Sequence, residues 1–140
     1  MHLGTQLLAG TFLVVLMTMV HGLGVVGVTR LLRLEDAALK AHRLNGRAFG
    51  LLTSMALSLF TIHAVEIWIY AAFYLAVGAI GDLEIALYFS ATAYATLGHP
   101  DVAFPIEWRL VGAFEGLVGF LLIGWSTAVF VTDMNKLLRK

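Results

Sequence analysis

The stretch that decides the fold is Tyr94-Ala95-Thr96-Leu97-Gly98-His99-Pro100-Asp101. It follows a short apolar run with a helical pattern, Leu83 to Ala95, and precedes a long apolar segment that begins near Arg109. Gly98 and Pro100 disfavour a helix within it. Backbone that is neither helix nor barrel is tolerated at membrane depth only where it is buried in protein or lines an aqueous path. If this stretch enters a membrane, it must therefore form such a lining.

The whole chain has the composition of one integral membrane domain. Of its 140 residues, 60% are hydrophobic and only 13% are charged, and its mean hydropathy is +0.89. Three segments reach the ~20 apolar residues that a membrane span requires. They run from about Leu7 to Val28, Leu51 to Val77 and Leu110 to Val131. The first lacks the basic start of a signal peptide and is expected to be retained. Leu83 to Thr96 is too short to span, which suits a re-entrant helix.

The basic residues are distributed unevenly along the chain. Five lie between the first two spans and three follow the third, whereas Arg109 alone lies between the second and third spans. The positive-inside rule therefore predicts that residues 30–48 and the C-terminus are cytoplasmic, with the N-terminus outside. We expect a multi-pass protein of the cell (inner) membrane. Leucines and alanines at helical spacing predict an interfacial amphipathic helix from Leu31 to Gly50, ended by Asn45-Gly46.

The order of these elements resembles the pore domain of potassium channels. The filter of that family reads Thr-Val-Gly-Tyr-Gly-Asp, and this chain keeps Thr96, Gly98 and Asp101. His99 and Pro100 stand where the family has tyrosine and glycine. The resemblance implies an all-α membrane protein with three transmembrane helices plus a re-entrant pore helix and filter loop, assembled as a tetrameric channel.

The resemblance extends on both sides of the filter and covers about residues 51–135. Ala86 to Ser90 resembles the aromatic-rich pore helix, and Trp108 to Val111 resembles the start of the inner helix. Gly119 lies near the hinge glycine of the family's inner helix. Thr92 and Tyr94 continue the pore-helix run, and Gly124 and Thr127 resemble common inner-helix positions. Residues 1–50 then add an N-terminal helix and a cytoplasmic loop, and residues 136–140 add a basic cytoplasmic tail.

The resemblance also implies the ligands and partners of the pore. In potassium channels, carbonyl rings from four subunits replace the hydration shell of the ion. A monovalent cation, K⁺ or Na⁺, would be held by the hydroxyl and carbonyl of Thr96 and the carbonyls of Leu97 and Gly98. The implied partners are three further copies of the chain and the lipid bilayer, with no nucleic acid and no cofactor. No nucleophile–base pair or phosphate-binding loop is present, so we predict no enzymatic activity.

The outer part of the filter departs from the family pattern. The second filter glycine takes a positive φ, which the ring of Pro100 forbids, so weak or altered selectivity is predicted. Four copies of His99 would gather at the mouth, which predicts inhibition by external acid or capture of zinc or copper. Alternatively, His99 hydrogen-bonds behind the filter, as the family's tyrosine does. Asp101, Glu107 and Asp82 would concentrate cations there, or they are ordinary solvated loop carboxylates.

Helical spacing predicts which residues line the lumen. Phe120, Ile123, Thr127 and Val131 are three or four residues apart and share one face. Apolar rings at Ile123 and Val131 would gate the pore by dewetting. The alternative is that this stripe packs against lipid or another helix.

Glu115 is a carboxylate within a span, where it costs ~2.5–3.5 kcal/mol unless it has a partner. It lies about one helical turn before Gly119. We predict that it faces the pore helix, bonds Thr92, Tyr94 or Ser90, and so supports the filter.

Two histidines and a second glutamate also lie within the spans. His63 and Glu66 share a helical face and predict a hydrogen-bonded pair, and His21 predicts a hydrogen-bond donor between helices. Two other functions remain open at this stage. One is a non-conducting structural or regulatory protein with the channel fold, its mouth sealed by His99 and Pro100. The other is a small haem- or metal-binding bundle that uses His21 and His63, which would show a Soret band if haem is bound.

Overall fold

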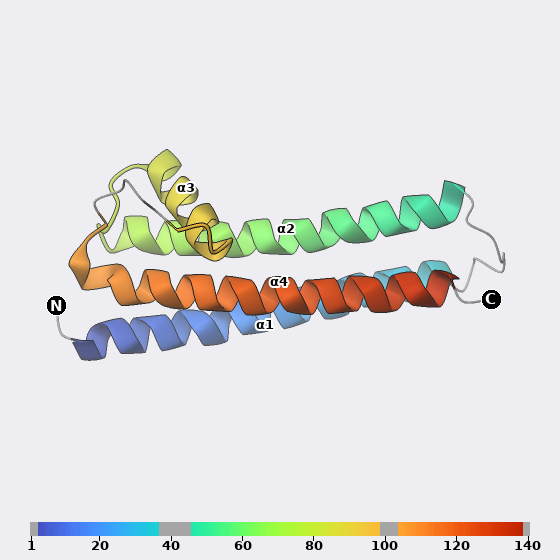
Figure 1. Ribbon diagram of the computed structural model, residues 1–140, viewed down its shortest axis with the longest axis horizontal. Helices are drawn as coiled ribbons and strands as arrows, with labels where there is room; N and C mark the ends of the chain where they lie inside the picture. Colours follow the sequence, from blue (N-terminus) through green and yellow to red (C-terminus); the bar gives the residue numbers. More distant parts are fainter. Residues whose placement is uncertain (1–2, 37–45, 99–103, 139–140) are drawn as a thin grey trace.

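The computed structural model describes residues 3–36, 46–98 and 104–138, and these residues form helices and their connections. The helices are α1 (Leu3–Asp36), α2 (Gly46–Ala76), α3 (Leu83–Tyr94), the short 3₁₀ helix η1 (Ile106–Trp108) and α4 (Arg109–Leu138). The three long helices run side by side, and α3 lies against α2 and α4 near one end of the bundle (Figure 1). That end holds the start of α1, the end of α2 and the start of α4 (Figure 1).

The three predicted spans are confirmed. Helical segments long and apolar enough to cross a membrane are Leu3–Leu31, Phe49–Ala76 and Ile106–Asn135. The 28 residues of the second extend over about 42 Å at a rise of ~1.5 Å per residue, which exceeds the ~30 Å hydrocarbon core and leaves room for tilt.

The predicted interfacial helix from Leu31 to Gly50 was wrong at both ends. Helix α1 continues without interruption to Asp36, and Gly46, predicted to stop a helix, begins α2. No glycine or proline lies between Val28 and Asp36, so nothing breaks the hydrogen-bond ladder of α1. Residues 37–45 lie outside the described residues.

The chain turns from α2 into α3 through two capping residues. Gly78 has a φ of +67°, and the Ala79 N–H donates to the Tyr74 carbonyl at 2.9 Å, as in a Schellman cap. Asp82 then accepts a hydrogen bond from the backbone N–H of Ile85 at 3.0 Å and caps the N-terminus of α3. The short helix predicted from Leu83 is therefore present and has defined ends.

Aromatic rings fix α3 and the segment before α4 onto α2. Phe89 of α3 meets Tyr74 edge-on at 5.2 Å between ring centroids. Phe104 stacks on Phe89 at 4.1 Å and meets Tyr74 edge-on at 5.3 Å. Trp108 of η1 packs edge-on against Phe73 at 5.2 Å. Such pairs contribute about 0.5–1.5 kcal/mol each beyond burial, so α3 is held firmly against α2.

Helix α1 is an integral part of the bundle. Its residues Leu13 and Met17 are buried in the same core as Val118 and Leu122 of α4. The Gln6 side chain accepts a hydrogen bond at 3.3 Å from a backbone N–H in the first turn of α4, where the helix itself offers no acceptor.

Candidate pore loop and its buried support

Thr96, the first residue of the candidate filter, completes the C-terminal cap of α3. Its N–H donates to the Ala93 carbonyl at 2.9 Å, and the Leu97 N–H donates to the Thr92 carbonyl at 2.9 Å. The φ of Thr96 is +59°, so it occupies the position that Gly78 occupies in the cap of α2. A β-branched residue rarely adopts this left-handed conformation, which costs about 1–2 kcal/mol. Backbone strain therefore lies at the first residue of the candidate filter.

Thr96→Gly should raise the free energy of unfolding by about 1 kcal/mol, because glycine adopts a positive φ without steric cost. Thermal unfolding of the detergent-solubilised protein measures this change. The reciprocal variant Gly78→Thr introduces the same strain at the α2 cap and should lower stability by about 1–2 kcal/mol. If the Thr96→Gly protein melts below the wild type, the contacts of the Thr96 side chain stabilise the fold by more than its left-handed backbone conformation destabilises it.

The candidate filter is described only in part. Leu97 is 77% exposed, and Gly98 has a φ of +76°. The role of Thr96, Leu97 and Gly98 as cation ligands stays a prediction. His99, Pro100 and Asp101 lie outside the described residues.

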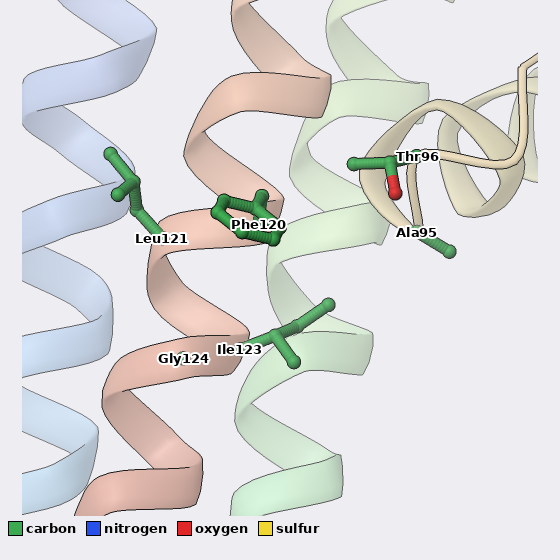
Figure 2. Close-up of a pocket in the computed structure, with 6 residues that line it drawn as sticks. All are labelled: Ala95, Thr96, Phe120, Leu121, Ile123 and Gly124. Carbon is green, nitrogen blue, oxygen red and sulfur yellow. The ribbon is translucent and has the colours of Figure 1, made fainter.

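The end of α3 faces α4 across an open apolar pocket of about 340 Å³. Figure 2 shows Ala95 and Thr96 on one side and the side chains of α4 on the other. The α4 residues that line the pocket are Phe120, Leu121, Ile123 and Gly124. Phe120 is 65% exposed and Ile123 is 40% exposed.

The other two residues of the predicted lumen stripe follow along α4. Thr127 is exposed, and its hydroxyl donates to the Ile123 carbonyl at 2.8 Å. Val131 is 41% exposed. Among the described residues, no helix of the same chain buries the stripe. It therefore faces a neighbouring subunit, lipid or an aqueous lumen.

Gly119 allows the last turn of α3 to approach α4 closely. A Cβ atom at this position would lie 2.2 Å from the carbonyl oxygen of Tyr94 and 2.9 Å from its Cγ. Helix α4 continues without a break through Gly119. The residue therefore serves close packing, and its predicted role as a hinge stays a prediction.

Glu115 ties α4 to both α2 and α3. It is fully buried and accepts a hydrogen bond from the Tyr74 hydroxyl at 2.6 Å and another from the Ser90 hydroxyl. Ser90 is also 2.9 Å from the carbonyl of Ile67. The expected contact between Glu115 and the short helix is thus made through Ser90. Each oxygen of the buried carboxyl group therefore has a hydroxyl partner, and the one hydrogen of Ser90 is shared between Glu115 and the Ile67 carbonyl.

Two other predicted partners of Glu115 bond elsewhere. The Thr92 hydroxyl donates at 2.9 Å to backbone carbonyls of its own helix, those of Tyr88 and Phe89. Tyr94 bonds Glu66 instead. Tyr74 had not been predicted as a partner. The sequence did contain a signal for a polar role of Tyr74. Glu66, Tyr70 and Tyr74 are spaced four residues apart, so they lie on one face of α2.

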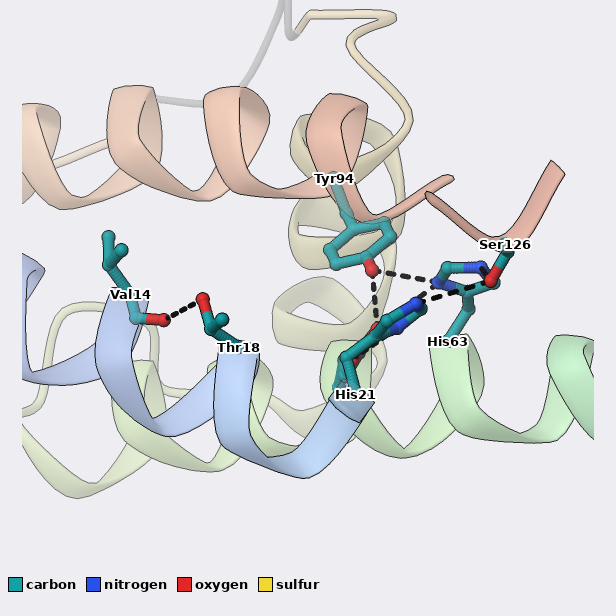
Figure 3. Close-up of polar contacts among 7 residues, drawn as sticks. Val14, Thr18, His21, His63, Tyr94 and Ser126 are labelled. Atoms are coloured by element: carbon teal, nitrogen blue, oxygen red, sulfur yellow. Dashed lines mark hydrogen bonds and ion pairs between the residues drawn. The ribbon is translucent and has the colours of Figure 1, made fainter. Parts of the chain in front are cut away.

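A second buried cluster surrounds Glu66 and draws side chains from all four α-helices (Figure 3). The Glu66 carboxylate lies 3.1 Å from Nδ1 of His21 and 3.1 Å from Nδ1 of His63, one oxygen for each. The Tyr94 hydroxyl donates to the oxygen that faces His63, and its own oxygen lies 2.8 Å from Nδ1 of His63. Ser126 Oγ lies 3.0 Å from Nε2 of His63 and 3.3 Å from Nε2 of His21. The predicted His63–Glu66 pair and the interhelical role of His21 are both present.

The geometry of the two histidines does not suit haem. Their ring centroids are 5.2 Å apart with the planes tilted by 37°. Both Nε2 atoms face Ser126 and both Nδ1 atoms face Glu66. The two imidazoles are close together and point the same way. No porphyrin ring therefore fits between a nitrogen of one and a nitrogen of the other.

These features define a class of protein: a helical membrane protein with a short helix and loop between its second and third spans, supported by buried polar contacts. A family model described as "Ion channel", of the two-transmembrane potassium-channel type, matches residues 51–136. The chain therefore belongs to this ion-channel family. No curated protein and no solved structure gives a match.

Proposed function

We propose that this chain is one subunit of a homotetrameric cation channel whose filter is Thr96 to Asp101. The observation that carries the proposal is the position of Ala95 and Thr96 beside the exposed stripe of α4, within the segment that matches the ion-channel family. One chain supplies one loop, so a ring of ligands around an ion requires several copies related by rotational symmetry.

The exposed face of α4 supports this assembly. In the tetramer, Phe120, Ile123, Thr127 and Val131 line the lumen below the filter. Leu117, also on α4, is 57% exposed in the single chain and is available to pack against a neighbouring subunit or lipid. Large apolar side chains that line a pore can gate it by dewetting.

The filter of this channel has fewer ion sites than that of a selective potassium channel. Thr96, Leu97 and Gly98 provide the inner ligands for K⁺ or Na⁺, whereas the ring of Pro100 excludes the usual outer geometry. The positive-inside rule places the filter on the outer side of the cell membrane, the N-terminus outside and the C-terminus in the cytoplasm.

Bi-ionic recording from the reconstituted protein tests the proposal. With K⁺ on one side and Na⁺ on the other, we expect a reversal potential near zero, because the outer carbonyl rings are lost. External acid should reduce the current, and His99→Gln should remove that effect. Tight K⁺ selectivity would contradict the weakened filter. Absence of cation flux in liposomes would favour the non-conducting alternative.

A further inference from the structure

We infer that His21, His63 and Glu66 form an intramembrane binding site for a divalent transition-metal ion, with Zn²⁺ as the best-fitting class. One ligand atom from each residue lies within 4.8 Å of the other two. Two imidazoles and one carboxylate are a donor set that proteins use for Zn²⁺. The site goes beyond the proposed channel function, because its occupancy can be measured whether or not the protein conducts.

The donor atoms lie close together, with each imidazole beside its own oxygen of Glu66. Nδ1 of His21 and Nδ1 of His63 each lie 3.1 Å from a Glu66 oxygen. Zinc bonds of about 2.0–2.1 Å set tetrahedral donors about 3.3 Å apart, so a small movement of the side chains closes the site. The side chains of His21 and Glu66 are fully buried, whereas that of His63 is 15% exposed. An ion therefore enters from the side of His63.

The three ligand residues are hydrogen-bonded by neighbouring side chains of the kind that orient metal ligands in proteins. Ser126 Oγ lies within hydrogen-bond distance of Nε2 of both histidines, and a hydroxyl oxygen can accept from both. With both Nε2 atoms protonated, both Nδ1 lone pairs face Glu66. The Tyr94 hydroxyl donates to Glu66. Metal-ligating histidines usually donate their other ring N–H to an oxygen, and ligating carboxylates are themselves hydrogen-bonded.

The protons of these five side chains cannot satisfy all their contacts. Tyr94 has one hydrogen for Glu66 and for Nδ1 of His63, which lies 2.8 Å from its oxygen, and Ser126 has one hydrogen for two facing Nε2 atoms. With neutral imidazoles and an ionised carboxylate, the side chains supply four hydrogens for six contacts, so at least one contact has no hydrogen and two lone pairs repel each other there. A cation among the Nδ1 atoms and Glu66 removes this repulsion. It also compensates a buried charge that is costly inside a membrane.

The test is a Zn²⁺ titration of the full-length protein in detergent, after removal of metal with a chelator and in competition with a chromophoric indicator. We expect one Zn²⁺ per chain. Glu66→Gln removes the anionic ligand with little change of shape and should weaken binding by at least about 100-fold. The control Glu84→Gln makes the same substitution at an exposed position of α3 and should bind like the wild type. Absence of Zn²⁺ binding by the wild type would overturn the proposal and indicate that a proton alone completes the cluster.

A measurement on the wild type keeps the test independent of whether the variants fold. Zinc-edge X-ray absorption of the loaded protein should show two imidazole nitrogens and a carboxylate oxygen at about 2.0–2.2 Å. Fewer than two imidazoles would overturn the site. Loss of binding in His99→Gln would also overturn it, because the metal would then lie at the candidate filter.

Discussion

Gly119→Ala should displace the last turn of α3 and lower the free energy of unfolding by about 3 kcal/mol or more, beyond the usual cost of overpacking. The new methyl group would lie 2.2 Å from the Tyr94 carbonyl oxygen. A backbone atom cannot move aside by changing rotamer, so α3 as a whole must shift. Tyr94 is followed within two residues by Thr96, so cation flux should fall together with thermal stability.

Gly124→Ala is the matched control for this experiment. It makes the same substitution on the same helix, at a glycine where an added Cβ would meet nothing within 4 Å. Its free energy of unfolding should equal that of the wild type or exceed it by up to about 1 kcal/mol, because alanine is favoured over glycine inside a helix. If the two variants melt alike, the close approach of α3 and α4 at Gly119 does not exist in the folded protein.

Glu115→Gln should lower stability by about 1–3 kcal/mol, the usual cost of leaving a buried polar group without its hydrogen-bond partner. The Tyr74 and Ser90 hydroxyls both donate to this side chain, whereas glutamine offers only one acceptor oxygen. Its amide N–H₂ would then face another donor. Because Ser90 lies on α3, the ion selectivity or gating of the channel should change as well. Thermal unfolding and bi-ionic recording measure the two effects.

Three further variants isolate the cause of that loss. Glu84→Gln makes the same substitution at an exposed position of α3 and should be near neutral. Tyr74→Phe should reproduce the loss, because it removes one donor to Glu115. Tyr70→Phe should not, because within the described residues the Tyr70 hydroxyl is buried without a hydrogen-bond partner. Wild-type currents and stability in Glu115→Gln would argue against a supporting role for this carboxylate.

Length and hydropathy predicted the three long helices and the short helix α3, but not how far α1 and α2 extend. The three spans exceed the length that a bilayer demands, and the run from Leu83 falls short of it. The main error concerned Gly46, where a helix-breaking residue stands at the start of α2 rather than at the end of a helix. Glycine is unfavourable inside a helix but tolerated at its first position, so its identity alone does not distinguish a start from a stop.

The buried partners could be predicted only within a helix. His63 and Glu66 are three residues apart, so helical geometry alone brings them together. The bonds from Tyr74 to Glu115 and from Tyr94 to Glu66 join different helices, and they depend on how each helix is rotated about its axis. Hydropathy gives little information on that rotation when a span is apolar on every side.

The left-handed conformation of Thr96 had no signal in the sequence. Residues that end a helix in this way are usually glycine or asparagine. The resemblance to a potassium-channel filter predicted only that a filter loop begins at this residue.

The contribution of His21 to the Glu66 cluster limits how far the channel domain can be treated as a separable module. Helix α1 lies outside the segment that matches the ion-channel family, yet His21 faces one of the two oxygens of a carboxylate on the first helix of that segment. Without α1, that oxygen would lose its imidazole, and the apolar face of α4 that covers Leu13 and Met17 would be uncovered. We therefore expect the segment that matches the family to need α1 for its stability, so a chimera that transplants it should carry the N-terminal helix along.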